Sequence, residues 1–309
     1  MGFSVLMSVY KKEKPEYLRE ALESVTNQPL PPDEIVLVED GPLTAELDET
    51  IDKIEKQLVQ KDKLEEQLAQ NDKLAQNDKL AQQIEMKRQG QSYKERLPQL
   101  KVVKLEQNQQ LGRALAEGLK HCTNELVARM DTDDIAVSDR FEVQYRYMAE
   151  HPEIAVSGGL MEEFDPADES YRKVKNMPTS KENIKSYSRY RNPVNHMTVM
   201  FRKAKVEAAG GYRHFPFLED YDLWIRMQAK GCEFANIDKV FVRARTERDI
   251  YKRRGGRKYC RQYLELRKQQ RQLGLLNIKE YTVAIVLTIG MTLQPSWLRK
   301  LVYQRALRK

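Results

Sequence analysis

The sequence is poor in cysteine and opens without a long hydrophobic run. Its three cysteines, Cys122, Cys232 and Cys260, are odd in number and show no Cys-x-x-Cys spacing, so they suggest neither a disulfide framework nor a zinc site. The first ten residues lack a basic leader followed by an extended apolar segment. We therefore expect no signal peptide and a cytoplasmic location.

Acidic residues are scarce in the last part of the chain. From Tyr251 onward, 15 Lys and Arg stand against 2 Asp and Glu, so the net charge of +7 belongs to this tail. Residues 281–298 carry no charge, but Gly290, Gln294 and Pro295 make a full membrane span less favoured than an interfacial helix. The tail, residues 246–309, is therefore predicted to associate peripherally with an anionic membrane surface and not with nucleic acid.

A length of 309 residues, with 40% apolar and 32% charged residues, fits one large soluble α/β domain with a tail, or two modest domains. Apolar runs with β-forming residues alternate with segments of helical periodicity, a pattern that predicts a parallel sheet. Strands are expected at residues 3–10, 34–38, 100–105, 126–130 and 154–158, and helices at residues 15–27, 112–121 and 139–150.

Residues 44–97 interrupt this alternation with a charged, glutamine-rich segment that repeats Asn-Asp-Lys-Leu-Ala-Gln at residues 71–76 and 77–82. Its first part keeps one helical stripe, but six residues advance a helix by about 600°, so the repeat leaves that stripe. We predict a helical insertion that projects from the domain, with a possible protein partner. A dispensable repeat expansion is the alternative.

Acidic residues gather where strands are predicted to end. Asp40 follows the second strand, and Asp131-Thr132-Asp133-Asp134 follows the fourth. Because ligands of open α/β sheets bind beyond the carboxyl ends of the strands, these acids are expected to face one crevice. Asp131 and Asp133 could hold Mn²⁺ or Mg²⁺ beside a diphosphate. Alternatively, they cap a helix or fill a turn.

A second acidic pair, Glu219 and Asp220, lies among aromatic residues just before a predicted helix at residues 223–227. A carboxylate in such surroundings can act as a general base, because partial burial raises its pKa. A structural role as a helix N-cap is the competing interpretation.

Taken together, these features make the sequence resemble glycosyltransferase family 2, of the bacterial surface-polysaccharide type. The resemblance follows the family's motifs in order along most of the chain. They are Met7-Ser8-Val9-Tyr10, Val38-Glu39-Asp40-Gly41, Asn108 with Leu111-Gly112-Arg113-Ala114-Leu115, Met130-Asp131-Thr132-Asp133-Asp134, Asn192-Pro193-Val194-Asn195-His196 and Leu218-Glu219-Asp220-Tyr221-Asp222-Leu223-Trp224.

The resemblance implies roles for individual residues. Asp220 would be the general base, with Glu219 orienting the base or the acceptor, and Asp133 would be the principal metal ligand, together with Asp131. The nucleotide sugar would be bound by Ser8, Tyr10, Asp40, Asn108, Arg113 and Asp131. The acceptor or the diphosphate would be contacted by His196, Trp224 and Arg245.

Two positions depart from the family pattern. Gln110 stands where many relatives have glycine before Leu-Gly. Near Arg243 and Arg245 many relatives have a histidine that completes the metal shell, yet no histidine follows His214. The diphosphate could instead be held by Arg243, Arg245, Lys252, Arg253 or Arg254, or these basic residues could simply begin the membrane-facing tail.

Taken together, we expect an α/β, GT-A Rossmann-like nucleotide-sugar-binding domain over residues 1–245, with its insertion, followed by the amphipathic helical tail. The function implied by the resemblance is that of an inverting, metal-dependent hexosyltransferase in capsule or O-antigen synthesis. Its donor would be UDP-linked and its acceptor lipid-linked or polysaccharide, at the inner face of the plasma membrane. A catalytically silent scaffold for other glycosyltransferases is the alternative.

Overall fold

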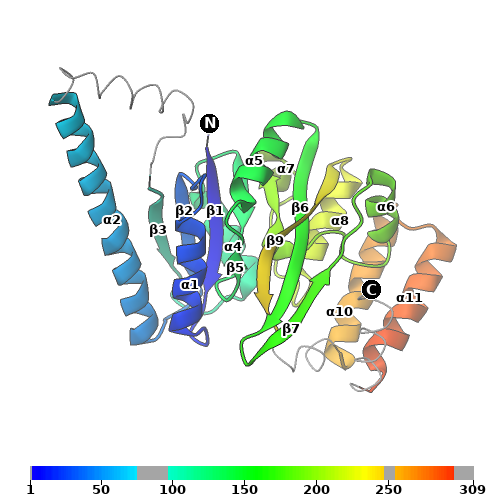
Figure 1. Cartoon of the computed structure of the whole chain (residues 1–309). Helices are drawn as coiled ribbons and strands as arrows, with labels where there is room; N and C mark the ends of the chain where they lie inside the picture. The colour runs from blue at the N-terminus through cyan, green and yellow to red at the C-terminus, as the bar shows by residue number, and fades with distance from the viewer. Residues whose placement is uncertain (1, 75–96, 247–254, 296–309) are drawn as a thin grey trace.

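The computed structural model describes residues 2–74, 97–246 and 255–295, and of residues 61, 62, 64–74 and 169 only the backbone. Most of the hexapeptide repeat and the basic residues from Arg299 to Lys309 lie outside this part of the chain. The described residues form a nine-stranded sheet with helices on both faces and a helical hairpin at one end (Figure 1).

The first half of the sheet is parallel, as the alternation of strands and helices predicts. Its order is β3-β2-β1-β4, and β1 pairs in parallel with both β2 and β4. The carboxyl ends of these strands therefore share one edge. The strands are β1 (Phe3–Val9), β2 (Glu34–Glu39), β3 (Gln99–Lys104) and β4 (Leu126–Arg129).

The second half of the sheet is mixed, which the sequence did not indicate. β8 runs antiparallel to β4 and β6, β6 and β9 are parallel, and β5 and β7 add antiparallel edges to β9 and β6. Because β8 runs antiparallel to β4, the segment just before β8 lies beside the carboxyl end of β4. These strands are β5 (Ile135–Ala136), β6 (Ile154–Asp165), β7 (Asp168–Lys175), β8 (Met200–Arg202) and β9 (Glu233–Arg245).

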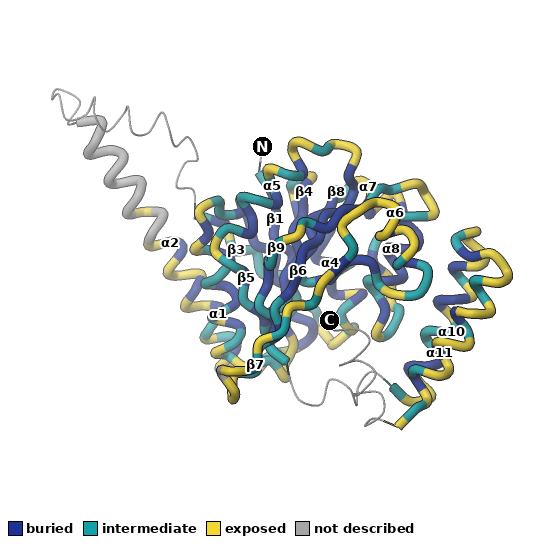
Figure 2. Tube along the Cα trace, turned by 45° about the vertical axis from the view of Figure 1, so that its right-hand side comes forward, coloured by how far each residue is buried: buried dark blue, intermediate teal, exposed yellow. Residues whose placement is uncertain are grey.

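Two hydrophobic layers cover the sheet because alternate strand residues point to opposite faces, and the central strands are buried between these layers (Figure 2). In β1, Val5 and Met7 pack with α1, α2 and α5, whereas Leu6 packs with α4 and α8. The covering helices are α1 (Pro15–Thr26), α2 (Ala45–Leu74), α4 (Leu111–His121), α5 (Arg140–Glu150), α6 (Lys181–Tyr187), α7 (Lys203–Ala208) and α8 (Glu219–Ala229), with a 3₁₀ turn, η1, at His196–Thr198.

Helix α2 begins at the predicted start of the insertion but is not peripheral there. It crosses from β2 to the parallel strand β3, and its stripe of Leu47, Ile51, Ile54 and Leu58 is buried in the core. Since a parallel pair needs a crossover connection, these turns complete the βαβ unit. Beyond Leu58 the helix continues past the sheet (Figure 1).

Helices α10 (Arg257–Gln272) and α11 (Ile278–Leu293) pack against each other as a hairpin beside α8. Leu266 of α10 is buried with Leu218, Tyr221 and Ile225 of the α8 region, so the tail docks on the domain. None of the described helices is both long and apolar enough to cross a bilayer.

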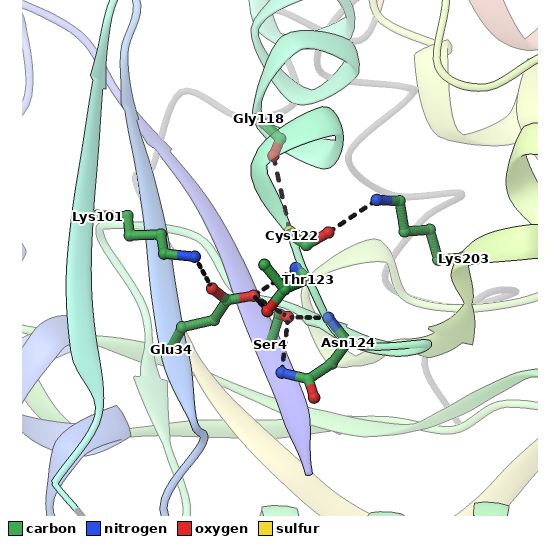
Figure 3. Close-up of polar contacts among 8 residues, drawn as sticks. All are labelled: Ser4, Glu34, Lys101, Gly118, Cys122, Thr123, Asn124 and Lys203. Atoms are coloured by element: carbon green, nitrogen blue, oxygen red, sulfur yellow. Dashed lines mark hydrogen bonds and ion pairs between the residues drawn. The ribbon is translucent and has the colours of Figure 1, made fainter. Parts of the chain in front are cut away.

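A buried polar network ties the amino ends of the central strands together (Figure 3). The Glu34 carboxylate accepts hydrogen bonds from the Ser4 hydroxyl at 2.6 Å and from the Thr123 backbone N–H and hydroxyl at 2.6 and 2.9 Å, and it pairs with Lys101. Although burial opposes ionisation, these donors lower the pKa of Glu34 from 4.5 to about 2. The charged form is therefore the one that stabilises the fold.

We predict that Glu34→Gln lowers the free energy of unfolding by about 2 kcal/mol near neutral pH, because charge-assisted hydrogen bonds are lost. The pKa of Glu34 is lower in the folded than in the unfolded state, so its contribution is full above pH 4.5 and disappears as the pH falls toward 2. Urea unfolding at several pH values should show the deficit shrinking in acid. Exposed Glu106→Gln is the control, and an equal deficit at every pH would contradict the assignment.

Candidate active site

A cavity of about 530 Å³ opens between the end of β4, the start of α8 and the α10–α11 hairpin. Its wall includes Asp131, Asp133, His196, Asp220 and Arg245, five of the residues predicted for the site. This volume is in the range typical of ligand sites. Segments separated by up to 161 residues, from Asp131 to Thr292, thus contribute to one cavity.

Three acidic residues within four positions just after β4 form a cluster that fits a hard divalent cation. Asp131, Asp133 and Asp134 each offer a carboxylate oxygen, and these oxygens lie within 4.8 Å of one another. Carboxylate oxygens are the ligands that Mg²⁺ and Mn²⁺ prefer. The structure thus brings the two predicted metal ligands together and adds Asp134.

Proton affinities show how much negative charge is concentrated in this cluster. Burial, with the charges of Asp131 and Glu13, raises the pKa of Asp133 from 3.8 to about 7. Burial and the charges of Asp131 and Asp133 raise the pKa of Asp134 well above its usual value. A cation bound here would offset this repulsion.

Beneath the cluster lies Arg129, a charged residue within an otherwise apolar strand. Its guanidinium pairs with the Asp131 carboxylate, yet its Nε and Nη1 atoms have no hydrogen-bond partner among the described residues. Only 2% of the side chain is exposed. Its positive charge lowers the pKa of Asp133, Asp134, Glu219 and Asp220, counteracting part of their mutual repulsion.

Arg245 closes the far side of the cluster. Its backbone N–H donates to Asp134 at 3.1 Å, and its guanidinium donates to the Asp133 carbonyl and pairs with Glu20. The guanidinium also lies 4.2 Å from the centre of the Tyr17 ring. It therefore holds the acidic turn against α1 while lining the cavity.

Asp220, at the first turn of α8, faces the cavity with a defined orientation. Its Oδ2 accepts a hydrogen bond from the Asn192 amide, and its Oδ1 accepts one from the Tyr221 backbone N–H at 2.7 Å. Burial raises its pKa, and these two hydrogen bonds lower it in part. The carboxylate is thus positioned and more basic than one in water.

Glu219 and His196 adjoin this carboxylate in different ways. Burial and the charge of Asp220 raise the pKa of Glu219 to about 7, but Glu219 is not part of the cavity wall. His196 lines the cavity, and its Nε2 lies 2.9 Å from the Tyr212 hydroxyl. Burial lowers the pKa of His196 well below 6.5, so its ring is neutral at neutral pH.

Of the residues predicted to bind the nucleotide, Asp131 lines this cavity and the others lie outside it. Ser8 and Tyr10 flank the last residue of β1, and Asp40 directly follows the neighbouring strand β2. Asp40 accepts a hydrogen bond from the Gln109 N–H at 2.6 Å, and the Asn108 amide donates to the Asp40 carbonyl at 3.1 Å. These two hydrogen bonds fix the loop before α4.

One departure of the sequence from the family pattern directly follows these two hydrogen bonds. Gln110, the residue before α4, has φ of +69°, a left-handed conformation that favours glycine. The backbone at Gln110 therefore has the conformation that the glycine of the family pattern would favour. Arg113 lies exposed on the first turn of α4.

Trp224 does not reach the cavity. It is fully buried on α8, with its ring against Phe234 at 5.8 Å and His196 at 6.1 Å between centroids. The periodicity of α8 places Trp224 on the sheet side, four residues after Asp220 but one layer deeper. The structure therefore places it behind His196 and not in contact with an acceptor.

Several cavity residues were missed because nothing in the sequence places them near the acids. Lys175 ends β7, Arg191 follows α6, and Arg267 lies on α10, yet all three line the same wall. The Arg267 guanidinium donates to the carbonyl oxygens of Arg189 and Tyr190 at 3.0 and 2.6 Å. The burial of Arg267, which the sequence does not reveal, is what brings it to the site.

Comparison with known proteins gives consistent matches. The family model for glycosyl transferase family 2 matches residues 4–71 and 75–207. The amylovoran biosynthesis glycosyltransferase AmsE of Erwinia amylovora is 35% identical and covers 98% of both chains. The UDP-Gal:alpha-D-GlcNAc-diphosphoundecaprenol beta-1,3-galactosyltransferase of Escherichia coli is 31% identical over 99% of this chain and 97% of its own length.

Solved structures share the fold at low sequence identity. S. aureus TarS 1–349 in complex with UDP-GlcNAc is 16% identical with a TM-score of 0.59, and the match covers 100% of this chain and 76% of that one. The mannosyltransferase PcManGT from Pyrobaculum calidifontis, in complex with GDP-Man and Mn²⁺, is 14% identical with a TM-score of 0.54 and covers 99% and 79%. These likenesses establish the architecture.

We predict opposite effects of Asp133→Asn with and without metal. In EDTA at mildly alkaline pH the variant should melt above the wild type, because the raised pKa of Asp133 means that its charged form destabilises the fold. Saturating Mn²⁺ should raise the melting temperature of the wild type by about 3 °C or more and that of the variant far less. Exposed Asp238→Asn is the control, and equal metal shifts in both variants would contradict the site.

Proposed function

The chain belongs to glycosyl transferase family 2, and we propose that it transfers a sugar from a nucleotide diphosphate sugar to a lipid-linked glycan in a single metal-assisted displacement. The observation that carries this is the placement of the carboxylates of Asp131, Asp133 and Asp220 on one cavity wall. Two of them offer oxygens to a cation, while the third carries a raised pKa and a fixed orientation.

Asp131 and Asp133 would hold Mn²⁺ or Mg²⁺, with Asp134 supporting the turn through its bond from the Arg245 N–H. When bound, the ion neutralises negative charge that develops on a departing nucleoside diphosphate. Ser8, Tyr10 and Asp40, at the carboxyl ends of the adjacent strands, would bind the nucleotide. Support for a UDP-linked donor comes from the galactosyltransferase relative.

Asp220 would remove the proton from the acceptor hydroxyl as that oxygen attacks the sugar. Its raised pKa increases its basicity, and the Asn192 amide leaves Oδ2 anchored while the cavity side remains accessible. Attack opposite to the departing diphosphate inverts the anomeric centre. Glu219 and neutral His196 would orient the base and the acceptor.

A donor panel tests the activity. The full chain is incubated with nucleotide sugars that differ in base and sugar, with Mn²⁺ or Mg²⁺ or EDTA, and released nucleoside diphosphate is measured. We expect one donor to be turned over in the presence of metal. Release equal to the protein-free rate for every donor would instead support a catalytically silent scaffold.

We predict that Asp220→Asn reduces kcat by about 10² or more with little change in donor affinity, because only proton removal is lost. In the wild type, kcat should fall as the pH drops through the raised pKa of Asp220, since the base must be deprotonated. The residual rate of the variant should lack this acid limb. A large loss of donor affinity would make Asp220 a binding residue.

Asn192→Ala provides a second test of the same assignment. Loss of the amide bond raises the pKa of Asp220 further, so the acid limb should move to higher pH while the plateau rate changes less. Asn183→Ala, at an exposed position of α6, is the matched control. An unchanged pH profile would show that the limb does not report Asp220.

The α10–α11 hairpin supports peripheral association with an anionic membrane. The solvent-facing side of α11 is strongly apolar, with exposed side chains at Ile278, Val283, Val286, Leu287, Ile289 and Leu293. An exposed apolar helix face beside basic residues is typical of interfacial helices. The described residues of α10 supply part of this basic charge.

We predict that Val286→Glu weakens binding to vesicles that contain anionic phospholipid by about tenfold, because Val286 is 64% exposed at the centre of the apolar face. Val59→Glu makes the same change at an exposed helical valine far from the hairpin and should leave binding unchanged. Vesicle sedimentation at low and high salt measures both. Equal binding by the two variants would make the α11 face a protein-packing surface.

A further inference from the structure

We propose that Arg191 and Lys175 form a subsite for the diphosphate of a prenyl-diphosphate-linked acceptor, and that the aromatic and apolar side chains beside α11 receive the first part of its lipid. This inference rests on the proposed function and assigns the acceptor end of the cavity. The argument depends on the order in which charged, polar and apolar groups follow one another along the wall.

The segment after α6 spans the distance between the catalytic carboxylate and the hairpin. At one end the Asn192 amide donates to Asp220. At the other, the carbonyl oxygens of Arg189 and Tyr190 accept hydrogen bonds from Arg267 of α10, and Arg189 pairs with Glu280 of α11 at 3.0 Å. Arg191 therefore lies between the base and the hairpin.

Two cations reach the cavity at this point. The Arg191 guanidinium lies 5.5 Å from the centre of the Tyr187 ring, and no carboxylate of the described residues is paired with it. Lys175 ends β7 and is close enough to Asp220 for its charge to act on that group. Arginine recognises phosphate oxygens with a bidentate geometry, and lysine adds a point charge.

Arg245, beside the acidic cluster, is already engaged with Asp133 and Glu20. A positive subsite on the acceptor side of Asp220 has the charge that suits an acceptor whose sugar is followed by a diphosphate. A neutral glycan would offer no negative charge to Arg191, which is paired with no carboxylate of the described residues.

Beyond the cations the wall becomes apolar. Phe217 is 55% exposed and has φ of +70°, an unfavourable conformation for a phenylalanine, and its ring lies 5.6 Å from that of Tyr259. Leu287 and Met291 of α11 complete this end of the cavity. Leu287 also belongs to the exposed apolar face of α11, so the cavity is continuous with the proposed membrane surface.

The probe is farnesyl diphosphate, and its binding is measured by calorimetry in EDTA, without donor and without turnover. Metal is omitted so that the acidic cluster repels the anion. We expect Arg191→Gln and Lys175→Gln each to weaken binding about tenfold, from the loss of charge-assisted contacts. Leu287→Gln should weaken farnesyl diphosphate binding and leave binding of methyl diphosphate unchanged.

Arg172→Gln removes the same charge from β7 outside the cavity and is the matched control. Asp133→Asn distinguishes the donor end, because binding there would tighten when the repelling carboxylate is removed. Absence of wild-type binding, equal weakening by Arg172→Gln, or sensitivity to Asp133→Asn alone would overturn the subsite. Failure of the donor panel would overturn the proposed function, and since binding is measured without donor, the two failures are distinguishable.

Discussion

The site depends on keeping several carboxylates close together in a partly buried space. Asp131, Asp133 and Asp134 follow β4 within four residues, and Glu219 and Asp220 approach from α8, so burial and their mutual repulsion raise the pKa of Asp133 and of Glu219 to about 7. Arg129 opposes this repulsion from below, with one contact to Asp131 and two nitrogen atoms unpaired among the described residues. A buried guanidinium with unsatisfied donors is costly. Its position at the end of a parallel strand, directly under the acids, is therefore best understood as the electrostatic support that lets the acids remain together before a cation arrives.

A second constraint is mechanical and concerns the segment between α6 and η1. Asn192 fixes Asp220, while the carbonyl oxygens of Arg189 and Tyr190 are fixed by Arg267, a buried side chain whose donors are satisfied by neutral oxygens that also include the Tyr221 hydroxyl at 3.1 Å. The tail thus contributes to the geometry of the carboxylate through a short series of hydrogen bonds. For this reason α10 is part of the cavity wall. The boundary expected at residue 245 marks a change in sequence composition, but residues on both sides of it line the cavity.

The sequence was most informative where local pattern and topology agree. Strand alternation and flanking turns located β1, β2, β4 and their acidic ends to within one or two residues, and parallel pairing then requires Asp40 and Asp131 to share an edge. The antiparallel return of β8 was not predictable, because three residues carry too little pattern to show direction. Trp224 was expected at the acceptor or the diphosphate but lies in the core, because a motif gives the spacing of residues and not the side of the helix that meets the sheet. Arg267 contacts residues 77 and 78 positions away, a pairing that only the folded chain reveals.

Helix α11 exposes its large apolar side chains to solvent and buries small ones, the reverse of an ordinary surface helix. Ala284, Thr288 and Thr292 face inward, where small side chains permit close approach to α10 and the Thr288 hydroxyl accepts from Arg267 at 3.4 Å. The isoleucine, leucine and valine side chains face outward, where each forfeits about 25 cal/mol for every Å² left in water. Folding of this chain alone gives no reason for that arrangement, since exchanging the two faces would bury more apolar area. The proposed membrane surface would account for this outward face, and the continuity of the face with the cavity through Leu287 would give that surface access to the proposed acceptor end of the site.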